Sequence, residues 1–445
     1  MSAPTRARTL LRGATLVTCD ARHRVFRGDL LIEDGRIAAL GRVPRPRGTR
    51  VVDVRGRILL PGLVMAHVHL CQALMRGMAD DLPLLDWLKK RIWPLEAAHD
   101  ERTLRASAEL GLSELLTAGA TALLDLGTVH GHDVVFDACV RSGIRVVGGK
   151  TLMDSGAGVP SRLRQSTAQS LRDAESLEAG WAKHPSGRVR YAYIPRFILS
   201  CSEALVRGAA ERALASGARF HTHAAEHAGE RQAVQKILGA DDVDVLRRWG
   251  MRGDHASIAH GVQLTASQMR RLAADGVAVV HCPSANLKLG SGIAKVEQLR
   301  AAGIRVGLGP DGAPCNNNLD PWVELRRAAL LSSAVAGPGA VPAKDVLRMA
   351  TIEGAAILGL QDAVGSLELG KRADLVAVRV DGVHVTPVMD PTATLVYATQ
   401  ARDVEHVFID GRQVVRSGTL TTLDADEVVA TASREARRLQ RRAKI

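Results

Sequence analysis

The sequence predicts an α/β protein, in which a (β/α)₈ TIM-like barrel carries a small β-sandwich module built from both ends of the chain. Three observations support this fold class. The chain has 445 residues, too many for one small domain. Eight short apolar runs alternate with stretches of helical periodicity, and strand-and-turn patterns recur near both termini. We expect the module to comprise residues 1–57 and 366–420, the barrel residues 58–365, and a basic C-terminal helix residues 421–445.

The terminal segments have the pattern of β-hairpins. Residues 13–41 alternate apolar and polar side chains around Asp34-Gly35, and residues 403–418 do the same around Asp410-Gly411. Asp-Gly between alternating segments is a strong signal for a two-residue hairpin turn. We therefore expect the two ends of the chain to form one module beside the central region.

The central region contains eight apolar runs, each followed by a longer helical stretch. Alternating strands and helices predict a parallel sheet, and eight such units predict a closed barrel. An open doubly wound sheet is the alternative, but no Gly-x-Gly-x-x-Gly motif follows an early strand. The runs are ILLPGLVMAHV, ATALLDLG, IRVVGGKTL, RYAYIPRF, ARFHTHAA, ASIAHGV, VAVVHCP and RVGLGPDG.

The composition excludes several classes of protein. No apolar run approaches the roughly 20 residues that span a membrane, and no secretory leader is evident, so we expect a cytoplasmic protein. The six cysteines form no Cys-x-x-Cys motif and are expected to be free thiols. The net charge of +12 is spread along the chain, apart from the tail at 434–445, and does not favour nucleic-acid binding. We expect a small-molecule substrate and a homo-oligomer.

Histidines stand at the ends of several predicted strands. His67 and His69 end the first run, where alternate residues of a strand share one face. The active site of a barrel lies at the carboxyl ends of its strands, so these side chains should converge. Such convergence indicates that His67 and His69 are metal ligands, and imidazoles with a carboxylate suit zinc or iron. Later runs end in His221, His223, His260, His281 and Asp311.

Other candidates near the strand ends have two readings each. Glu226 follows His223 by three residues and is placed for proton transfer, although the same position suits a surface loop. His130 and His132 form a second His-x-His pair, but in a loop, so we favour a loop or pocket-edge role for them. Lys150 ends the third run and is the nearby lysine that could complicate a one-metal site.

Five segments carry a resemblance to a known family: PGLVMAHVHL, HTHAAEH, AHGV, HCPSANLKLGSG and GLGPDGAPCNNNLD. They resemble the amidohydrolase superfamily and, within it, the cytosine-deaminase-like branch. That branch includes methylthioadenosine/S-adenosylhomocysteine, 5′-deoxyadenosine and guanine deaminases and triazine hydrolases. The resemblance covers nearly the whole chain, is specific for the branch and says little about the substrate.

The resemblance implies roles for individual residues. It implies that Glu226 is the proton shuttle, that His260 orients the water, and that Asp311 also takes a proton. It further implies hydrolytic deamination, in which a metal-activated water adds to an amine-bearing ring carbon while Glu226 protonates the adjacent nitrogen. The fourth run offers Arg196 and no lysine, which favours a single divalent ion, zinc or alternatively iron. The implied ligands are His67, His69, His223 and Asp311.

The predicted substrate contacts point in two directions. Trp87 resembles the base-stacking tryptophan of nucleoside deaminases, although Leu85 stands where some members have a ribose-binding glutamate. Gln72 and Arg196 resemble the base-binding residues of guanine deaminase. We expect a 5′-modified adenosine, with guanine, 8-oxoguanine or a pterin as the alternative and an aminotriazine third. A catalytically inactive binding scaffold is disfavoured because every ligand and the shuttle are present. We also expect Arg196→Met to cost little packing and to spare adenosine turnover.

Overall fold

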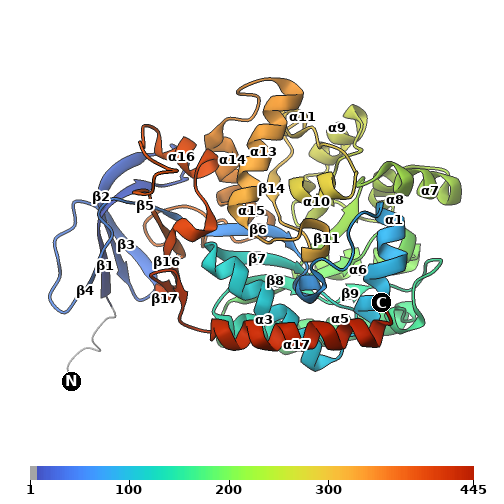
Figure 1. Ribbon diagram of the computed structural model, residues 1–445. Coiled ribbons are helices and arrows are strands. Elements are labelled where there is room, and N and C mark those ends of the chain that lie inside the picture. Colours follow the sequence, from blue (N-terminus) through green and yellow to red (C-terminus); the bar gives the residue numbers. More distant parts are fainter. Residues whose placement is uncertain (1–7) are drawn as a thin grey trace.

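The computed structural model describes residues 8–445, and the first part of the predicted module range, residues 1–7, lies outside the described residues. The predicted barrel is present as a sheet of parallel strands. Figure 1 shows it beside the terminal sheet, with helices around it. All eight apolar runs contribute a strand. The barrel strands are β6 (Leu63–Val68), β7 (Ala120–Leu126), β8 (Arg145–Gly149) with the short β9 (Thr151–Leu152), β10 (Val189–Pro195), β11 (Arg219–Ala224), β12 (Ala256–His260), β13 (Ala278–His281) and β14 (Val306–Leu308).

The barrel closes between its last and first strands. Gly309 N–H donates to the carbonyl of His281, which continues the β13–β14 pairing, and Asp311 N–H donates to the carbonyl of His67 at 3.2 Å. Val68 and Asp311 form a parallel bridge across the seam. The seam therefore lies where two of the predicted metal ligands leave the barrel.

The terminal module is one continuous sheet of nine strands drawn from both ends of the chain. Strand β5 pairs antiparallel with β15, which joins the N-terminal strands to the C-terminal ones. A separate core cluster of buried aliphatic side chains lies within this module. Its strands are β1 (Arg8–Val17), β2 (Val25–Glu33), β3 (Arg36–Gly41), β4 (Arg50–Asp53), β5 (Arg57–Pro61), β15 (Leu375–Arg379), β16 (Val404–Ile409), β17 (Arg412–Arg416) and β18 (Thr419–Leu420).

Both Asp-Gly pairs turn as the sequence predicts. Asp34 and Gly35 have φ of 48° and 76°, and Asp410 and Gly411 have φ of 48° and 72°. Two successive positive φ values define the type I′ turn, whose twist matches that of the flanking strands. A Cβ on Gly35 would lie 2.6 Å from the carbonyl oxygen of Asp410, so glycine permits the two turns to touch.

The first apolar run is split between the two sheets. Its first half is β5 in the terminal module and its second half is β6 in the barrel, with Gly62 between them. A Cβ on Gly62 would lie 2.0 Å from Oγ1 of Thr121, so only glycine allows this close passage. The strand that carries His67 is thereby anchored to the module directly upstream.

Helices surround the barrel, and the last one lies across it. Among residues 8–445, no helix is both long enough and apolar enough to cross a membrane. The principal helices are α1 (Leu84–Trp87), α2 (Trp93–Ala97), α3 (Glu101–Thr117), α4 (His132–Ser142), α5 (Thr167–Trp181), α6 (Glu203–Ser216), α7 (Ala228–Leu238), α8 (Asp242–Arg248), α9 (Ala266–Ala274), α10 (Pro283–Lys288), α11 (Val296–Ala301), α12 (Ala313–Asn316), α13 (Pro321–Ala336), α14 (Ala343–Met349), α15 (Ile352–Ile357), α16 (Pro391–Tyr397) and α17 (Ala425–Ala443).

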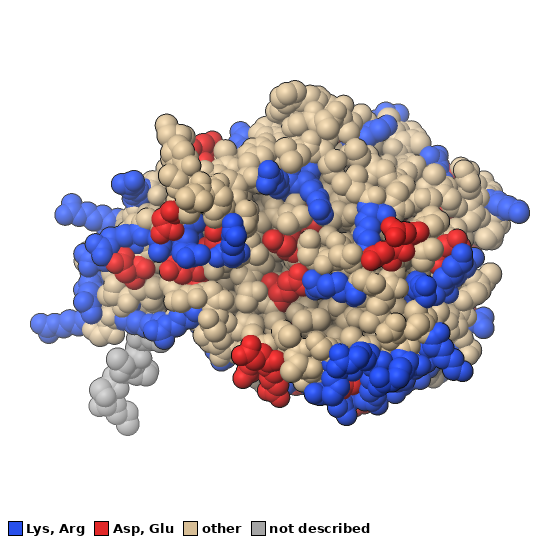
Figure 2. Space-filling model, in the orientation of Figure 1, with Lys and Arg blue, Asp and Glu red and all other residues tan. Residues whose placement is uncertain are grey.

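Helix α17 packs along α3 with its apolar face and exposes its basic face. Val428, Ala432 and Leu439 are buried at the helical spacing of that inner face. Figure 2 shows Lys and Arg side chains gathered over this helix. Arg438 and Arg442 pair with Asp100, the N-cap of α3, at 2.7 and 2.6 Å. Part of the positive charge of residues 434–445 therefore forms ion pairs that hold α17 against α3.

Candidate metal centre and active site

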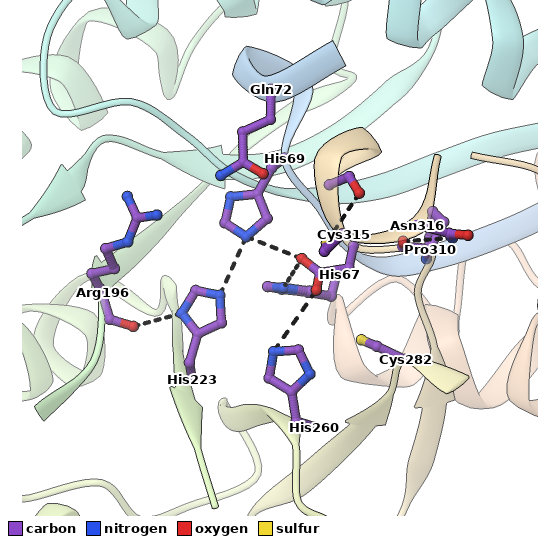
Figure 3. A network of polar contacts seen from close by, with 12 residues as sticks. His67, His69, Gln72, Arg196, His223, His260, Cys282, Pro310, Cys315 and Asn316 are labelled. Atoms are coloured by element: carbon purple, nitrogen blue, oxygen red, sulfur yellow. Dashed lines mark hydrogen bonds and ion pairs between the residues drawn. The ribbon is translucent and has the colours of Figure 1, made fainter. Parts of the chain in front are cut away.

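Four side chains from distant parts of the chain meet at the carboxyl end of the barrel. His67 lies in β6, His69 directly after it, His223 in β11, and Asp311 after β14. One ligand atom from each lies within 4.8 Å of the others. Asp311 Oδ1 is 3.2 Å from Nε2 of His67 and 3.3 Å from Nε2 of His69, and Nε2 of His69 is 3.2 Å from Nε2 of His223. Figure 3 shows the imidazoles turned toward one another.

Partners behind two of the histidines fix which nitrogen faces the cluster. Nδ1 of His67 lies 2.8 Å from Nε2 of His221, whose own Nδ1 lies 2.8 Å from Oγ of Ser257. Nδ1 of His223 lies 2.7 Å from the carbonyl oxygen of Arg196. Such contacts hold ring orientation and tautomer in metal sites. The sequence analysis placed His221 at a strand end without giving it a role. In the structure, His221 contacts the ring of His67 from behind and holds its orientation.

The geometry and charge of this cluster fit a divalent ion. Two ligand atoms about 2.0–2.1 Å from a tetrahedral ion are separated by about 3.3 Å, close to the separations observed here. Burial lowers the pKa of His69 and His223 well below the usual value, so both imidazoles are neutral. Burial opposes ionisation of Asp311, but its hydrogen bond with His67 and the neighbouring histidines hold its pKa well below the usual range. Three imidazoles and one carboxylate are ligands that suit zinc.

Two further polar side chains face the same cavity. Nε2 of His260 lies 3.5 Å from Oε2 of Glu226 and 4.0 Å from Oδ2 of Asp311. Burial, followed by the nearby charges of Glu230 and Asp311, raises the pKa of Glu226 well above its usual value. Burial lowers the pKa of His260 to about 4. Burial therefore favours the protonated form of Glu226, which lies beside a neutral imidazole.

Asn286 is a site residue that the sequence did not reveal. Its Oδ1 lies 2.9 Å from Nδ1 of His260, which leaves Nε2 of that ring facing the cavity. Asn286 belongs to the short helix α10 that follows β13, so its approach to His260 depends on the packing of neighbouring units. The predicted segment HCPSANLKLGSG contained it, but no spacing rule separates it from Asn residues that only cap turns.

The cavity beside the cluster is small and has an apolar cover. Leu84, Trp87 and Leu88 come from α1 and the turn after it, and Phe197 and Leu289 line other walls. The cavity volume is about 30 Å³, and a polar cavity needs about 10–15 Å³ to hold one water molecule.

Arg196 and Gln72 line the cavity but are tied to a carboxylate that the sequence analysis did not single out. Arg196 Nη1 and Nη2 donate to Glu96 at 2.5 and 3.1 Å, and Gln72 Nε2 donates to Glu96 at 2.8 Å. Glu96 and Arg196 are 5% and 3% exposed, so the pair is buried. Burial alone would lower the pKa of Arg196, but Glu96 raises it above the usual value. The expectation that Arg196→Met costs little packing leaves out this ion pair, because the change would leave Glu96 buried without its cation.

The remaining candidates lie outside the cluster. His130 is exposed and its ring contacts the carbonyl of Arg162, whereas His132 is buried at the start of α4.

Lys150 donates to Gln165 and lies 3.4 Å from Asp173. His281 is buried and does not belong to the four-ligand group. Asp86, beside Leu85, points to solvent and pairs with Lys90.

The site and the barrel together define a class of protein, the barrel hydrolases with metal ligands at their strand ends. A family model described as "Amidohydrolase family" matches residues 58–414. A 5-methylthioadenosine/S-adenosylhomocysteine deaminase of Moorella thermoacetica is 36% identical over 92% of this chain and 95% of its own length. The chain belongs to the amidohydrolase family. The expected enzyme class, a hydrolase of carbon–nitrogen bonds, is confirmed.

Solved structures agree with this assignment. An adenosine deaminase from Xanthomonas campestris with bound zinc superimposes with a TM-score of 0.92 at 30% identity, covering 98% of this chain and 99% of that one. Guanine deaminase of E. coli gives a TM-score of 0.82 at 27% identity, covering 92% and 99%. The fold is thus shared along nearly the full length of proteins whose names differ in substrate.

Proposed function

We propose that this protein is a one-metal hydrolytic deaminase of an amine-bearing N-heterocycle, with a 5′-modified adenosine as the preferred substrate. The observation that carries the proposal is the buried carboxyl of Glu226, which faces the same cavity as the cluster of three imidazoles and Asp311. A hydrolase that only bound a metal would not need a buried, protonated acid at that place. Its relatives named as deaminases support the reaction type.

His67, His69, His223 and Asp311 would hold the ion, with zinc as the first choice and iron as the alternative. When bound, the ion would lower the pKa of a coordinated water toward 7 and so supply the nucleophile. We propose a single ion, since the fourth barrel strand ends at Arg196 and Lys150 is engaged by Gln165 and Asp173. Assembly as a homo-oligomer and a cytoplasmic location stay predictions.

The chain's own residues divide the proton transfers. Burial raises the pKa of Glu226 and favours its protonated form, so Glu226 can donate to the ring nitrogen beside the reacting carbon. Asp311 is ionised and can accept a proton at its second oxygen, Oδ2, which faces His260. His260, held by Asn286, orients the water through Nε2. Protonating the ring nitrogen would make the amine-bearing carbon easier to attack, and the amine would leave as ammonia after it has itself received a proton, which Asp311 can return.

The cavity wall supports the choice of substrate in part. Trp87 is 5% exposed and covers the cavity, as a residue that stacks on a base should. Most of the remaining cover is aliphatic, which suits an uncharged substituent at the 5′ position. Neither Leu85 nor the solvent-facing Asp86 provides a carboxylate for the ribose hydroxyls. The nucleoside reading therefore rests on the relatives and on Trp87.

One specific observation favours a second candidate, an oxo-purine or pterin. Glu96 accepts from the amide nitrogen of Gln72, so Oε1 of Gln72 is left as a buried acceptor without a partner. An acceptor beside the guanidinium of Arg196 matches a ring edge that has an N–H next to a carbonyl. Guanine and its analogues present such an edge, and adenosine does not.

A screen for ammonia release tests the proposal and separates the candidates. The zinc-loaded protein is assayed with adenosine, 5′-deoxyadenosine, methylthioadenosine, S-adenosylhomocysteine, guanine, 8-oxoguanine, isoxanthopterin and melamine. We expect the highest kcat/KM among the 5′-modified adenosines. Efficient guanine turnover with no adenosine turnover would select the second candidate, and no release from any compound would refute the deaminase proposal.

A further inference from the structure

The turn that carries Glu226 has an unusual backbone. It joins β11 to α7, and its first residue, Ala225, has a φ of 52°. Residues with a side chain rarely adopt the left-handed region, because Cβ crowds the following carbonyl. Ala225 directly precedes Glu226 in the chain. Any relaxation of Ala225 to a common conformation would therefore turn the shuttle carboxyl away from the cavity.

Two neighbouring segments hold Ala225 in this conformation. Its N–H donates to Oδ2 of Asp242 at 2.5 Å, and its carbonyl accepts from the N–H of Gln263 at 2.8 Å. Asp242 is the first residue of α8 and is 2% exposed. Both backbone groups of Ala225 are thus bound by parts of the chain outside its own turn.

Helix capping explains only part of the contacts of Asp242. Its Oδ1 accepts from the N–H of Val243, the next residue of α8, whereas Oδ2 reaches across to Ala225. Asp241, and not Asp242, is the N-cap residue of the helix. A buried carboxylate is costly, and this one lies near another buried acid, Glu230. If this position only had to begin α8, a neutral side chain such as Ser would do so without the free-energy cost of burying a carboxylate.

We propose that Asp242 is a positioning residue, which aims the carboxyl of Glu226 into the cavity by holding the N–H of Ala225. Asp242 touches neither the metal-ligand cluster nor the cavity, and it acts through the turn alone. The inference rests on the proposed function, in which Glu226 transfers a proton. It adds α8, the helix between α7 and β12, to the elements that position Glu226.

The first test compares Asp242→Ala with Asp242→Asn and with the control Asp244→Ala. Asp244 is on the same helix but is partly exposed and pairs with Arg271 at the surface. A displacement of a reacting group by about 1 Å can cost 10²-fold in rate. We expect Asp242→Ala to lower kcat by roughly tenfold to a hundredfold, with KM and zinc content little changed. Asp242→Asn keeps an acceptor and should recover most of the loss, and Asp244→Ala should match wild type.

A second test asks whether Asp242 acts only through Glu226. In a Glu226→Gln background, the Asp242→Ala change should lower the residual kcat no further, because the group that Asp242 aims has already been removed. A full additional loss would overturn the proposal, as would full activity of Asp242→Ala or a loss of zinc in step with activity. If Asp242→Ala fails to fold, Asp242→Ser takes its place in both tests, because its side chain is one atom too short to reach the N–H of Ala225.

A third measurement does not depend on turnover. In the zinc-loaded wild type, the amide of Ala225 should exchange slowly with deuterium, and Asp242→Ala should speed that exchange without affecting β12. Slow exchange that persists in Asp242→Ala would refute the anchoring. If the wild type releases no ammonia from any compound but this exchange result holds, the proposed function has failed and the anchoring has not.

Discussion

At the scale of single residues, the cavity is defined by which nitrogen or oxygen each side chain turns inward. His67 and His223 present Nε2 because their other nitrogens are engaged by His221 and by a backbone carbonyl. Glu226 faces Nε2 of His260 and is set apart by burial, which raises the pKa of its carboxyl. The partners of the two imidazoles therefore fix their orientation, whereas burial sets the proton affinity of the Glu226 carboxyl.

Glu226→Gln should abolish most of the activity while leaving the protein folded and metal-loaded. The amide keeps the shape of the side chain but cannot carry the proton, and loss of a general acid–base group costs about 10²–10⁴ in rate. We expect kcat to fall by about 10²-fold or more, measured by ammonia release with zinc content determined in parallel. Glu211→Gln, an exposed position on α6, is the matched control. An active Glu226→Gln enzyme would remove the shuttle assignment.

Asn286→Ala should impair catalysis through His260. Without the amide oxygen, Nδ1 of His260 loses its partner and the ring can rotate within the cavity wall. A contact behind a reacting histidine typically contributes about 10- to 100-fold, by analogy with residues that orient metal-bound histidines. We expect a fall in kcat of that size with zinc retained. Unchanged kcat would show that the packing around His260 is enough to orient it.

Arg196→Met should destabilise the fold strongly, because Glu96 then remains buried without its cation. Removing one member of a buried ion pair costs about 3–5 kcal/mol. Urea unfolding monitored by fluorescence should show this loss. The double variant Arg196→Met/Glu96→Gln should recover much of it, since the neutral amide still accepts from Gln72. Equal stability of the single variant and wild type would contradict the buried pairing.

The residues that sequence reasoning found and those that it missed differ in a physical way. His67, His69, His223, His260 and Asp311 occupy strand ends, and a barrel brings all strand ends together whatever its loops do. Glu96, Asn286 and Asp242 reach their partners from short helices and turns after the strands. Their contacts depend on how adjacent βα-loops pack, which neither periodicity nor spacing reveals.

At the scale of elements, the eight apolar runs became the eight barrel strands because β-strand and helix periods differ enough to be separated. The split of the first run into β5 and β6 was not predictable from its composition, which is apolar throughout. Gly62 marks the break, but a glycine in a strand pattern has several explanations. Likewise, the basic tail predicted a helix with a solvated face, and the fastening of that helix to Asp100 required the structure.

Helix α17 should stabilise the segment that holds Glu96. Arg442 donates to the carbonyl of Ala98 at 2.8 Å as well as to Asp100, so α17 is tied to the chain directly after α2. The pairs are partly exposed, and each contributes at most about 1 kcal/mol. We expect Arg438→Ala/Arg442→Ala to lower the melting temperature by a few degrees and to speed deuterium exchange in residues 93–100.

The control for this prediction is Arg437→Ala/Arg441→Ala, which removes the same charge from exposed positions of α17. It should leave both the melting temperature and the exchange unchanged. If the two double variants behave alike, the net charge of the tail matters and the contacts with Asp100 and Ala98 do not.

At the scale of the whole molecule, an ion bound by the proposed ligands would couple the stability of the barrel to the supply of metal. The ligands come from the first, fifth and eighth strands, so an ion bound there stabilises the folded barrel over the unfolded chain by mass action. We expect close to one equivalent of zinc or iron by elemental analysis of protein purified without chelator. Chelation should lower the melting temperature, and zinc should restore it. Two equivalents of metal would contradict the single-ion proposal.

The closing seam has a consequence for how the protein is made. His67 and Asp311 are adjacent across the seam, yet Asp311 follows His67 by 244 positions in the chain. On the ribosome, the N-terminal ligands emerge long before the last one, and domains in general fold as units once their chain is available. The complete four-ligand set cannot exist on a nascent chain until β14 has left the exit tunnel. Under the proposed ligand set, metal capture would therefore be a late event of biosynthesis, and a ribosome that stops before Asp311 would release a chain without the complete set.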